Sequence, residues 1–180
     1  HIGSQILQTA PFAEAAGRMM DILREVTAKG GEVERIDLGG GLGIQYHPDV
    51  PAPSPSDLAQ AILPVIEDGC RDLGISPRLI LEPGRSIVAD STIMLTRVNV
   101  VKRAAVNFAA VDAGFNVLAR PMLYDSYHHI LPVDHAEGRE EMIYTIVGPI
   151  CESGDILARD RPLPRLVRGD ILAFLDAGAY

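Results

Sequence analysis

The chain has 180 residues, which is enough for one or two domains with a hydrophobic core. Hydrophobic residues make up 47% of it and charged residues 22%, a composition typical of a folded globular protein rather than a disordered one. The net charge of −8, without a basic run, argues against nucleic-acid binding, and no apolar run reaches the length of a membrane span. The sequence has neither a signal peptide nor a CxxC pair, so we expect a cytoplasmic protein.

The first predicted elements are a helix and a strand. Apolar residues at three- and four-residue steps predict a helix over residues 11–29, and two glycines end it. Residues 33–38 are typical of a buried strand, which leads into Gly39-Gly40-Gly41. Ile44 breaks a GxGxxG pattern, so the dinucleotide-binding signature is absent. The glycine triplet still allows a phosphate to approach the backbone, and a flexible turn is the alternative.

A second helix and strand repeat this pattern. We expect Ser56 to cap a helix that ends at Gly74, with Pro64 kinking or splitting it and Cys70 buried on it as a small hydrophobe. Residues 79–81 follow as a buried strand, so strand, helix and strand form a βαβ unit with a parallel sheet. The spacing of the strands fits a (β/α)8 barrel. Such a barrel needs roughly 250 residues, so we expect only its last part here.

The strand at 79–81 stops at Glu82-Pro83-Gly84-Arg85, a sequence that suits ligand binding. In α/β folds, ligands lie just past the carboxyl ends of the strands. Gly84 lets a ligand approach the backbone, Arg85 suits a phosphate or carboxylate, and Glu82 can hold a proton on a ligand nitrogen. The alternative for these four residues is a Pro-Gly turn with a solvated ion pair.

The hydrophobic period changes in the second half of the chain. Residues 92–98 alternate, and residues 142–150 and 170–175 are further strand candidates separated by glycines and prolines, which predicts an all-β domain. The expected fold is therefore α/β plus all-β. Residues 1–88 would form the C-terminal part of a (β/α)8 TIM-like barrel, and residues 89–180 an incomplete β-sandwich or β-barrel-like domain.

The predicted β-domain carries further reactive side chains. Arg120-Pro121-Met122-Leu123-Tyr124 offers a cation and a phenol. In Cys151-Glu152-Ser153-Gly154-Asp155 the acidic neighbours favour the protonated thiol, so Cys151 suits a proton donor better than a nucleophile. His128, His129 and His135 lack a cysteine partner or HExxH spacing, so we predict surface or core histidines and no metal site.

Taken together, seven motifs in this order resemble the diaminopimelate decarboxylase family. These are pyridoxal-phosphate-dependent decarboxylases with an alanine-racemase-like barrel, and the resemblance spans the whole chain. The motifs that carry it are His1-x-Gly3-Ser4-Gln5, Gly39-Gly40-Gly41, Glu82-Pro83-Gly84-Arg85, Asp112-Ala113-Gly114, Arg120-Pro121-x-Leu123-Tyr124, Cys151-Glu152-Ser153-Gly154-Asp155 and Gly178-Ala179-Tyr180.

The resemblance implies pyridoxal 5'-phosphate as the cofactor and implies which residues hold it. In the family pattern His1 stacks on the cofactor ring, and Glu82 pairs with the pyridine nitrogen and keeps it protonated. The residues implied to hold the phosphate or to border the cofactor are Ser4, Gly39, Gly40, Gly41, Pro83, Gly84, Arg85 and Tyr180.

The resemblance also implies a reaction, the loss of CO₂ from the D-centre of meso-2,6-diaminopimelate to give L-lysine, the last step of lysine biosynthesis. Cys151 matches the family's proton donor, which is supplied across a homodimer interface. The implied substrate contacts are Arg85, Arg120, Tyr124, Glu152 and Tyr180. Beyond the amino-acid substrate and a second copy of the chain, we expect neither a nucleic-acid nor a membrane partner.

Two features depart from the family pattern. The Schiff-base lysine of the family lies in the first part of its barrel, and neither Lys29 nor Lys102 fits that position. Because the chain also opens at His1 on what resembles a strand end and stops at Tyr180 within a motif, we expect a fragment that is inactive alone. Val117 stands where the family has an acid, which removes a local hydrogen bond.

Three alternatives follow from related proteins. The first is a decarboxylase of ornithine or arginine, whose members usually carry Asp after the cysteine, whereas Glu152 follows it here. The second is a catalytically inactive relative that binds or regulates a partner; the presence of Glu82, Arg85, Cys151 and Tyr180 argues against it. The third is a pyridoxal-phosphate carrier built from a single barrel domain, which the predicted β-domain argues against.

Overall fold

The computed structural model describes residues 1–133 and 138–180 and divides the chain into two compact units. The first unit comprises His1–Gln45 and Asp49–Ile87. The second unit comprises Tyr46–Pro48 and Val88–Tyr180. Each unit has its own hydrophobic core.

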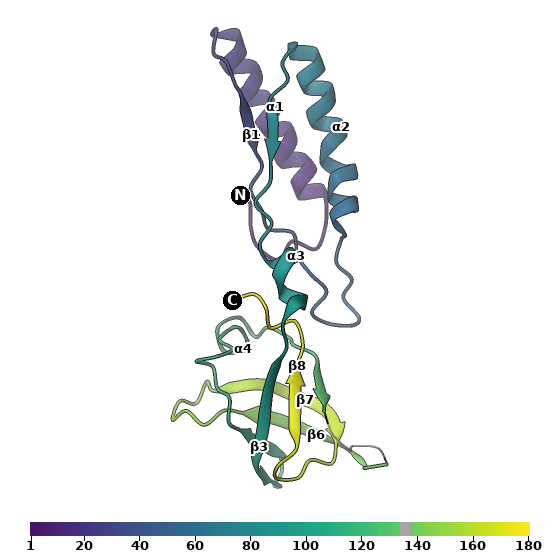
Figure 1. Cartoon of the computed structure of the whole chain (residues 1–180), viewed down its shortest axis with the longest axis vertical. Helices are drawn as coiled ribbons and strands as arrows, with labels where there is room; N and C mark the ends of the chain where they lie inside the picture. Colours follow the sequence, from purple (N-terminus) through teal and green to yellow (C-terminus); the bar gives the residue numbers. More distant parts are fainter. Residues whose placement is uncertain (134–137) are drawn as a thin grey trace. The chain divides into compact units, whose positions relative to one another are not determined.

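The first unit contains two long helices and a short parallel strand pair (Figure 1). Its elements are α1 (Ala10–Ala28), β1 (Arg35–Asp37), α2 (Pro55–Leu73) and β2 (Arg78–Ile80), and α3 (Arg85–Val88) follows β2. In the strand pair, Ile36 of β1 lies opposite Leu79 of β2. The predicted βαβ unit with parallel strands is confirmed, because β1, α2 and β2 form it.

The ends of α2 are set by local chemistry. The cap is Ser54 rather than the predicted Ser56: its hydroxyl accepts a hydrogen bond from the backbone N–H of Asp57, and the Asp57 carboxylate accepts one from the backbone N–H of Ser54. Gly74 ends the helix in the left-handed conformation, as predicted. Pro64 does not split α2, which continues from Pro55 to Leu73. Pro64 lies on the exposed side of the helix, and the neighbouring Ile62 is buried in the core.

The core of the first unit lies between the two helices and the strand pair. Phe12 and Met20 of α1 meet Ile62 and Ile66 of α2 and Ile36 of β1 in one buried cluster.

Among the described residues, no helix combines the length and apolar character needed to cross a membrane.

Cys70 packs against the same core as a partly buried side chain. Burial raises the pKa of its thiol. A thiol kept protonated among apolar groups fits the structural role predicted for it.

The second unit is built on a single six-stranded sheet, which confirms the predicted all-β character of this half. Its strands run in the order β5-β8-β3-β4-β6-β7; β4 and β6 are parallel and the other neighbours are antiparallel. The elements are η1 (Ala89–Ser91), β3 (Met94–Lys102), β4 (Phe108–Val111), the short helix α4 (Arg120–Tyr124), β5 (Ile130–Pro132), β6 (Glu141–Val147), β7 (Ile156–Pro164) and β8 (Ile171–Phe174).

The long strand β7 was not among the predicted strands. Its residues 159–161 are all charged, and Pro162 and Pro164 follow, so the expected alternation of apolar and polar residues is hidden. Asp160 adopts a positive φ of 50°, and the pairing with β6 shifts its register nearby. Such an irregularity bends a strand without ending it.

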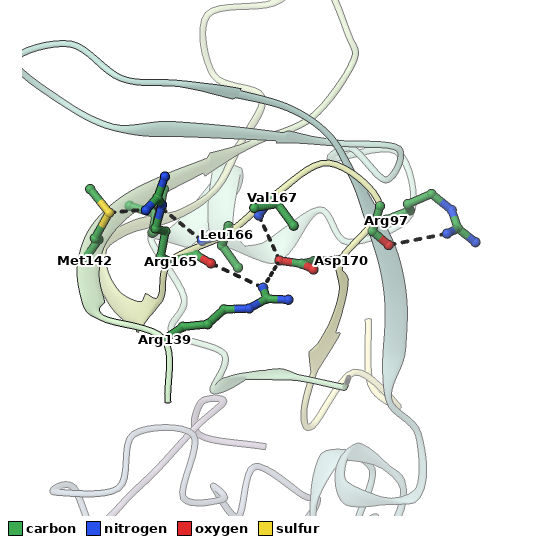
Figure 2. A network of polar contacts seen from close by, with 9 residues as sticks. Arg97, Arg139, Met142, Arg165, Leu166, Val167 and Asp170 are labelled. Carbon is green, nitrogen blue, oxygen red and sulfur yellow. Dashed lines mark hydrogen bonds and ion pairs between the residues drawn. The ribbon is translucent and has the colours of Figure 1, made fainter. Parts of the chain in front are cut away.

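A polar network fixes the turn between β7 and β8 (Figure 2). Arg139 Nη1 lies 2.6 Å from Asp170 Oδ2, which also accepts a hydrogen bond of 2.8 Å from the backbone N–H of Val167. Beside it, the buried Tyr144 hydroxyl accepts a hydrogen bond from Leu166 N. β8 begins at this anchored turn and leads on to the C-terminal segment that ends at Tyr180.

Candidate active site

In the first unit, three segments that are far apart in sequence meet at the carboxyl ends of the parallel strands β1 and β2. Ile6 forms a parallel bridge with Leu42, and its backbone N–H donates to the Gly41 carbonyl at 3.0 Å. The backbone N–H of Glu82 donates to the Gly39 carbonyl at 2.9 Å. The carboxyl ends of parallel strands share one edge, so the predicted residues of all three segments come together here.

The glycine triplet is required by the packing of these segments. A Cβ atom on Gly40 would overlap the carbonyl oxygen of Glu82, and one on Gly41 would overlap that of Gly3. Gly41 also has a φ of +108°, which side chains rarely allow. At Gly84, by contrast, a Cβ would meet no described atom within 4 Å, so this exposed glycine leaves room for a ligand at the backbone.

Arg85 is buried and held by the segment that opens the chain. Its Nη2 donates to Ser4 Oγ at 2.9 Å and its Nη1 to Gln5 Oε1 at 3.1 Å. Gln5 is itself fixed, because its Nε2 donates to the Ile44 carbonyl at 2.6 Å. Gln5 was not predicted as a site residue, although it stands in the first quoted motif. The result is an oriented guanidinium, three residues after the exposed Glu82 in the sequence.

An apolar pocket of about 300 Å³ lies beside this edge, between α2 and the strand ends. Gly39, Gly40 and Pro83 belong to its lining, and the described lining residues carry no charge. Such a pocket does not suit a phosphate, which needs cations or backbone N–H groups. The apolar interior of this pocket is therefore not a phosphate site.

In the second unit, Arg120 lies among three tyrosine rings. Its Cζ atom is 5.3 Å from the ring centroids of Tyr124 and Tyr180 and 5.9 Å from that of Tyr46. Its Nη2 donates to Ser126 Oγ at 3.3 Å. The structure thus brings together three predicted residues, Arg120, Tyr124 and Tyr180. Tyr46 was missed, because no motif marks it and only the fold brings it here.

His128 lies behind this cluster and is fully buried. Its Nδ1 is 2.9 Å from the Leu175 carbonyl oxygen, and its ring meets the Tyr46 ring edge-on at 5.2 Å between centroids. Burial lowers the pKa of His128, and the charge of Arg120 lowers it further. The prediction of a core histidine is therefore correct for His128, while His135 lies outside the described residues.

The Cys151–Asp155 motif separates into an anchor and an exposed tip. The buried Asp155 carboxylate accepts hydrogen bonds from Phe115 N at 2.7 Å and Ile150 N at 2.8 Å. Cys151 and Glu152 are exposed, and the Glu152 carboxylate accepts a hydrogen bond from the backbone N–H of Gly154. Asp155 thus fixes the base of a loop that presents the thiol and one acid to solvent.

The Asp112 motif also has a structural role. Asp112 Oδ1 accepts hydrogen bonds from Thr96 Oγ1 at 2.6 Å and from Arg97 N at 2.8 Å. These bonds, the hydroxyl first, lower the pKa of Asp112. Val117, the residue that replaces an expected acid, is exposed, and its backbone N–H donates to the Gly114 carbonyl at 3.0 Å. The turn is therefore closed by backbone hydrogen bonding.

Comparison with known proteins assigns the family. A family model described as pyridoxal-dependent decarboxylase, C-terminal sheet domain, matches residues 20–178. The chain belongs to the pyridoxal-dependent decarboxylases. Members of this family use pyridoxal phosphate as their cofactor, in agreement with the motifs at the segment ends.

Several decarboxylases resemble the chain over its whole length. A diaminopimelate decarboxylase of Archaeoglobus fulgidus is 54% identical to it. The solved diaminopimelate decarboxylase of M. jannaschii in complex with L-lysine is 41% identical, with a TM-score of 0.95. A lysine/ornithine decarboxylase of Vibrio vulnificus in complex with cadaverine is 26% identical, with a TM-score of 0.82. All of this chain is covered in each case, but only 43%, 41% and 47% of the respective relatives.

The anchor of the Cys151 loop predicts a first mutational result in the full-length protein to which this chain belongs. We expect Asp155→Ala to lower the free energy of unfolding by about 1–3 kcal/mol for each of the two backbone N–H groups left unpaired. Thermal unfolding measures the effect, with Ser153→Ala in the exposed tip as the control. Unchanged unfolding in Asp155→Ala would show that the anchor is dispensable.

His128 predicts a pH dependence of stability in the same protein. Because its pKa in the folded state lies below the ordinary value of 6.5, the unfolded state binds more protons as the pH falls through that value. His128 therefore destabilises the folded state on acidification. Between about pH 7.5 and 5.5 the unfolding midpoint should fall more in the wild type than in His128→Asn. Equal falls in the two proteins are the contrary result.

Proposed function

We propose that the protein to which this chain belongs catalyses the decarboxylation of meso-2,6-diaminopimelate to L-lysine and CO₂. The observation that carries this proposal is the 54% identity, over all 180 residues, to a curated diaminopimelate decarboxylase. The chain spans about two fifths of the length of that relative. We infer that residues 1–88 are the last part of a (β/α)8 barrel and residues 89–180 part of a C-terminal β-domain.

The segment ends of the first unit are the proposed cofactor site. When bound, pyridoxal phosphate supplies an electron sink for the carbon that loses CO₂. Glu82 would hold the proton on the ring nitrogen, and His1 would stack on the ring. The residues proposed to border the phosphate are Ser4, Gly39, Gly40, Gly41, Pro83, Gly84, Arg85 and Tyr180. The fixed Arg85 guanidinium and the open space at Gly84 support this assignment.

Four of the five proposed substrate contacts belong to the second unit, and Arg85 belongs to the first. Diaminopimelate carries an ammonium and a carboxylate at the end that does not react, so its recognition needs an acid and a base. Arg120 binds that carboxylate and Glu152 that ammonium, with Tyr124, Tyr180 and Arg85 as further contacts. The clustering of Arg120 with two exposed tyrosines supports this role.

Cys151 is the proposed proton donor. After CO₂ leaves, the thiol proton is transferred to the carbon that was bonded to the departing carboxylate. A new C–H bond on this carbon replaces the C–C bond that was broken. The exposure of Cys151 at a loop tip supports its delivery to the active site of a second copy in a homodimer. Cys70 and Cys151 are both free thiols, which supports a reducing compartment such as the cytoplasm.

The Schiff-base lysine is assigned to the part of the relatives that this chain does not match. Lys29 caps the C-terminal end of α1, and Lys102 is an exposed residue at the end of β3. Neither belongs to the three segments that carry the proposed cofactor residues. We therefore expect this chain alone to be inactive.

Two rival functions remain distinguishable. A decarboxylase of ornithine or arginine is disfavoured by Glu152 after the cysteine and by the lower identity, 26%, to a lysine/ornithine decarboxylase. An inactive relative that binds a partner is disfavoured by the ordered contacts of Arg85 and Arg120. The experiment that separates them is turnover by the full-length protein, stripped of cofactor and then resupplied with pyridoxal phosphate. We expect equal amounts of CO₂ and L-lysine only after resupply, and absence of turnover would favour the inactive relative.

A further inference from the structure

The orientation of Arg120 depends on the rings around it more than on hydrogen bonds. Its Nε is buried and has no hydrogen-bond partner among the described residues. The bond that holds the guanidinium is the 3.3 Å contact from Nη2 to Ser126 Oγ, which is long for an N–H···O bond. The faces of the aromatic rings therefore contribute much of its placement, since a guanidinium is attracted to them.

Tyr46 is the fixed member of the three rings. Its exposed fraction is 8%, against 68% for Tyr124 and 72% for Tyr180. An exposed ring on the surface changes its rotamer easily, whereas a buried ring keeps its place. Tyr46 is thus the one buried ring of the three, and it holds its place beside Arg120 although its centroid is the most distant, at 5.9 Å.

His128 in turn supports Tyr46. A carbonyl oxygen only accepts, so the contact to Leu175 fixes the proton of a neutral His128 on Nδ1. This bond ties the imidazole to the end of β8, and the ring then meets Tyr46 edge-on, at an interplanar angle of 68°. The order of contacts runs from the β8 end through His128 and Tyr46 to Arg120.

The charges around His128 keep the ring neutral. Arg120 on α4 and Arg161 on β7 both oppose a positive charge on it, while Asp176 after β8 favours one. Burial, the largest influence, also opposes the charge. His128 is therefore not a second cation beside Arg120 at neutral pH. The substrate carboxylate that Arg120 is proposed to bind then meets a single oriented guanidinium.

We propose that His128 is a positioning residue for substrate recognition, holding Tyr46 so that the Arg120 guanidinium faces the carboxylate at the non-reacting end of the substrate. This inference rests on the proposed function. His128 itself touches neither substrate nor cofactor, so its replacement should change the KM for meso-diaminopimelate much more than kcat.

The test uses the full-length enzyme loaded with pyridoxal phosphate. His128→Asn keeps a donor for the Leu175 carbonyl but removes the ring from Tyr46, and His128→Phe keeps a ring but removes the donor. We expect His128→Asn to raise the KM by about 2- to 30-fold, the range of a lost cation–aromatic contact, with kcat nearly unchanged. His128→Phe should raise it less. His129→Asn, in the adjacent residue, is the control and should leave the KM unchanged.

A double-mutant cycle with Arg120 distinguishes positioning from a general effect on the fold. In an Arg120→Ala background, His128→Asn should cause no further loss of kcat/KM, because the group that it positions is gone. An equal loss of kcat/KM in both backgrounds, or an unchanged KM in His128→Asn, overturns the inference. The proposed function still stands in that case if the wild type converts meso-diaminopimelate. A wild type that does not convert meso-diaminopimelate contradicts both.

Discussion

Replacing Cys151 with alanine in the full-length enzyme is expected to slow turnover of meso-diaminopimelate by about 10²- to 10⁴-fold, the usual contribution of a positioned proton donor. The thiol lies at the exposed tip of a loop whose base is fixed by Asp155. Removing the thiol takes away the proton that we propose replaces CO₂ on the substrate, but it leaves the loop anchored. Steady-state release of L-lysine measures the effect.

The matched control is Ser153→Ala in the same exposed tip. Its hydroxyl donates to Glu152 at 3.2 Å and has no part in the proposed proton transfer, so turnover should stay near that of the wild type. Cofactor absorbance should be unchanged in both variants, since neither residue belongs to the proposed cofactor site. Full activity in Cys151→Ala would remove the thiol from the reaction.

Replacing Arg120 with alanine is expected to change substrate selection. A buried charge left without its partner costs about 2–5 kcal/mol. In Arg120→Ala the charge left without its proposed partner is the carboxylate at the non-reacting end of the substrate. We therefore predict that kcat/KM for meso-diaminopimelate falls by roughly 30-fold to several-thousand-fold. Lysine and ornithine lack a carboxylate at the non-reacting end, so any trace activity on them should fall far less. The measurement is kcat/KM for the three amino acids.

A lysine at position 120 provides the control for charge. Arg120→Lys keeps the positive charge but loses the planar guanidinium that lies against Tyr46, Tyr124 and Tyr180. It should recover only part of the loss. If Arg120→Ala weakened all three substrates equally, the residue would serve the fold or the cofactor, and recognition of the far carboxylate would be wrong.

The edge where the candidate cofactor residues meet could be predicted because it follows from local patterns. Buried strands around Ile36 and Leu79 with a helix between them can pair only in parallel at this spacing, and their carboxyl ends then coincide. The residues that follow each strand are thus expected to lie close together. The cap was assigned to Ser56 instead of Ser54, although Ser54-Pro55-Ser56-Asp57 has a serine three residues before an acid and a proline at the first helical position.

The surroundings of Arg120 could not be predicted in this way. Tyr46 and His128 stand in no periodic pattern, and their contact depends on how distant loops pack. Asp155 was counted among the acidic neighbours of Cys151 because it follows in the same motif, yet its carboxylate is buried and accepts hydrogen bonds from two backbone N–H groups. Proximity in sequence identified the loop, but only burial separates its anchor from its reactive tip.

The most direct test of the proposed function is a competition experiment with the full-length enzyme and pyridoxal phosphate. The enzyme is given equal concentrations of isotopically labelled meso-diaminopimelate and unlabelled L-lysine, L-ornithine and L-arginine, so that newly formed L-lysine can be told from the L-lysine supplied. Labelled L-lysine, the amine products and CO₂ are then quantified. The proposal predicts that L-lysine is formed from diaminopimelate and accounts for nearly all of the CO₂. Cadaverine, putrescine or agmatine as the main product would contradict it.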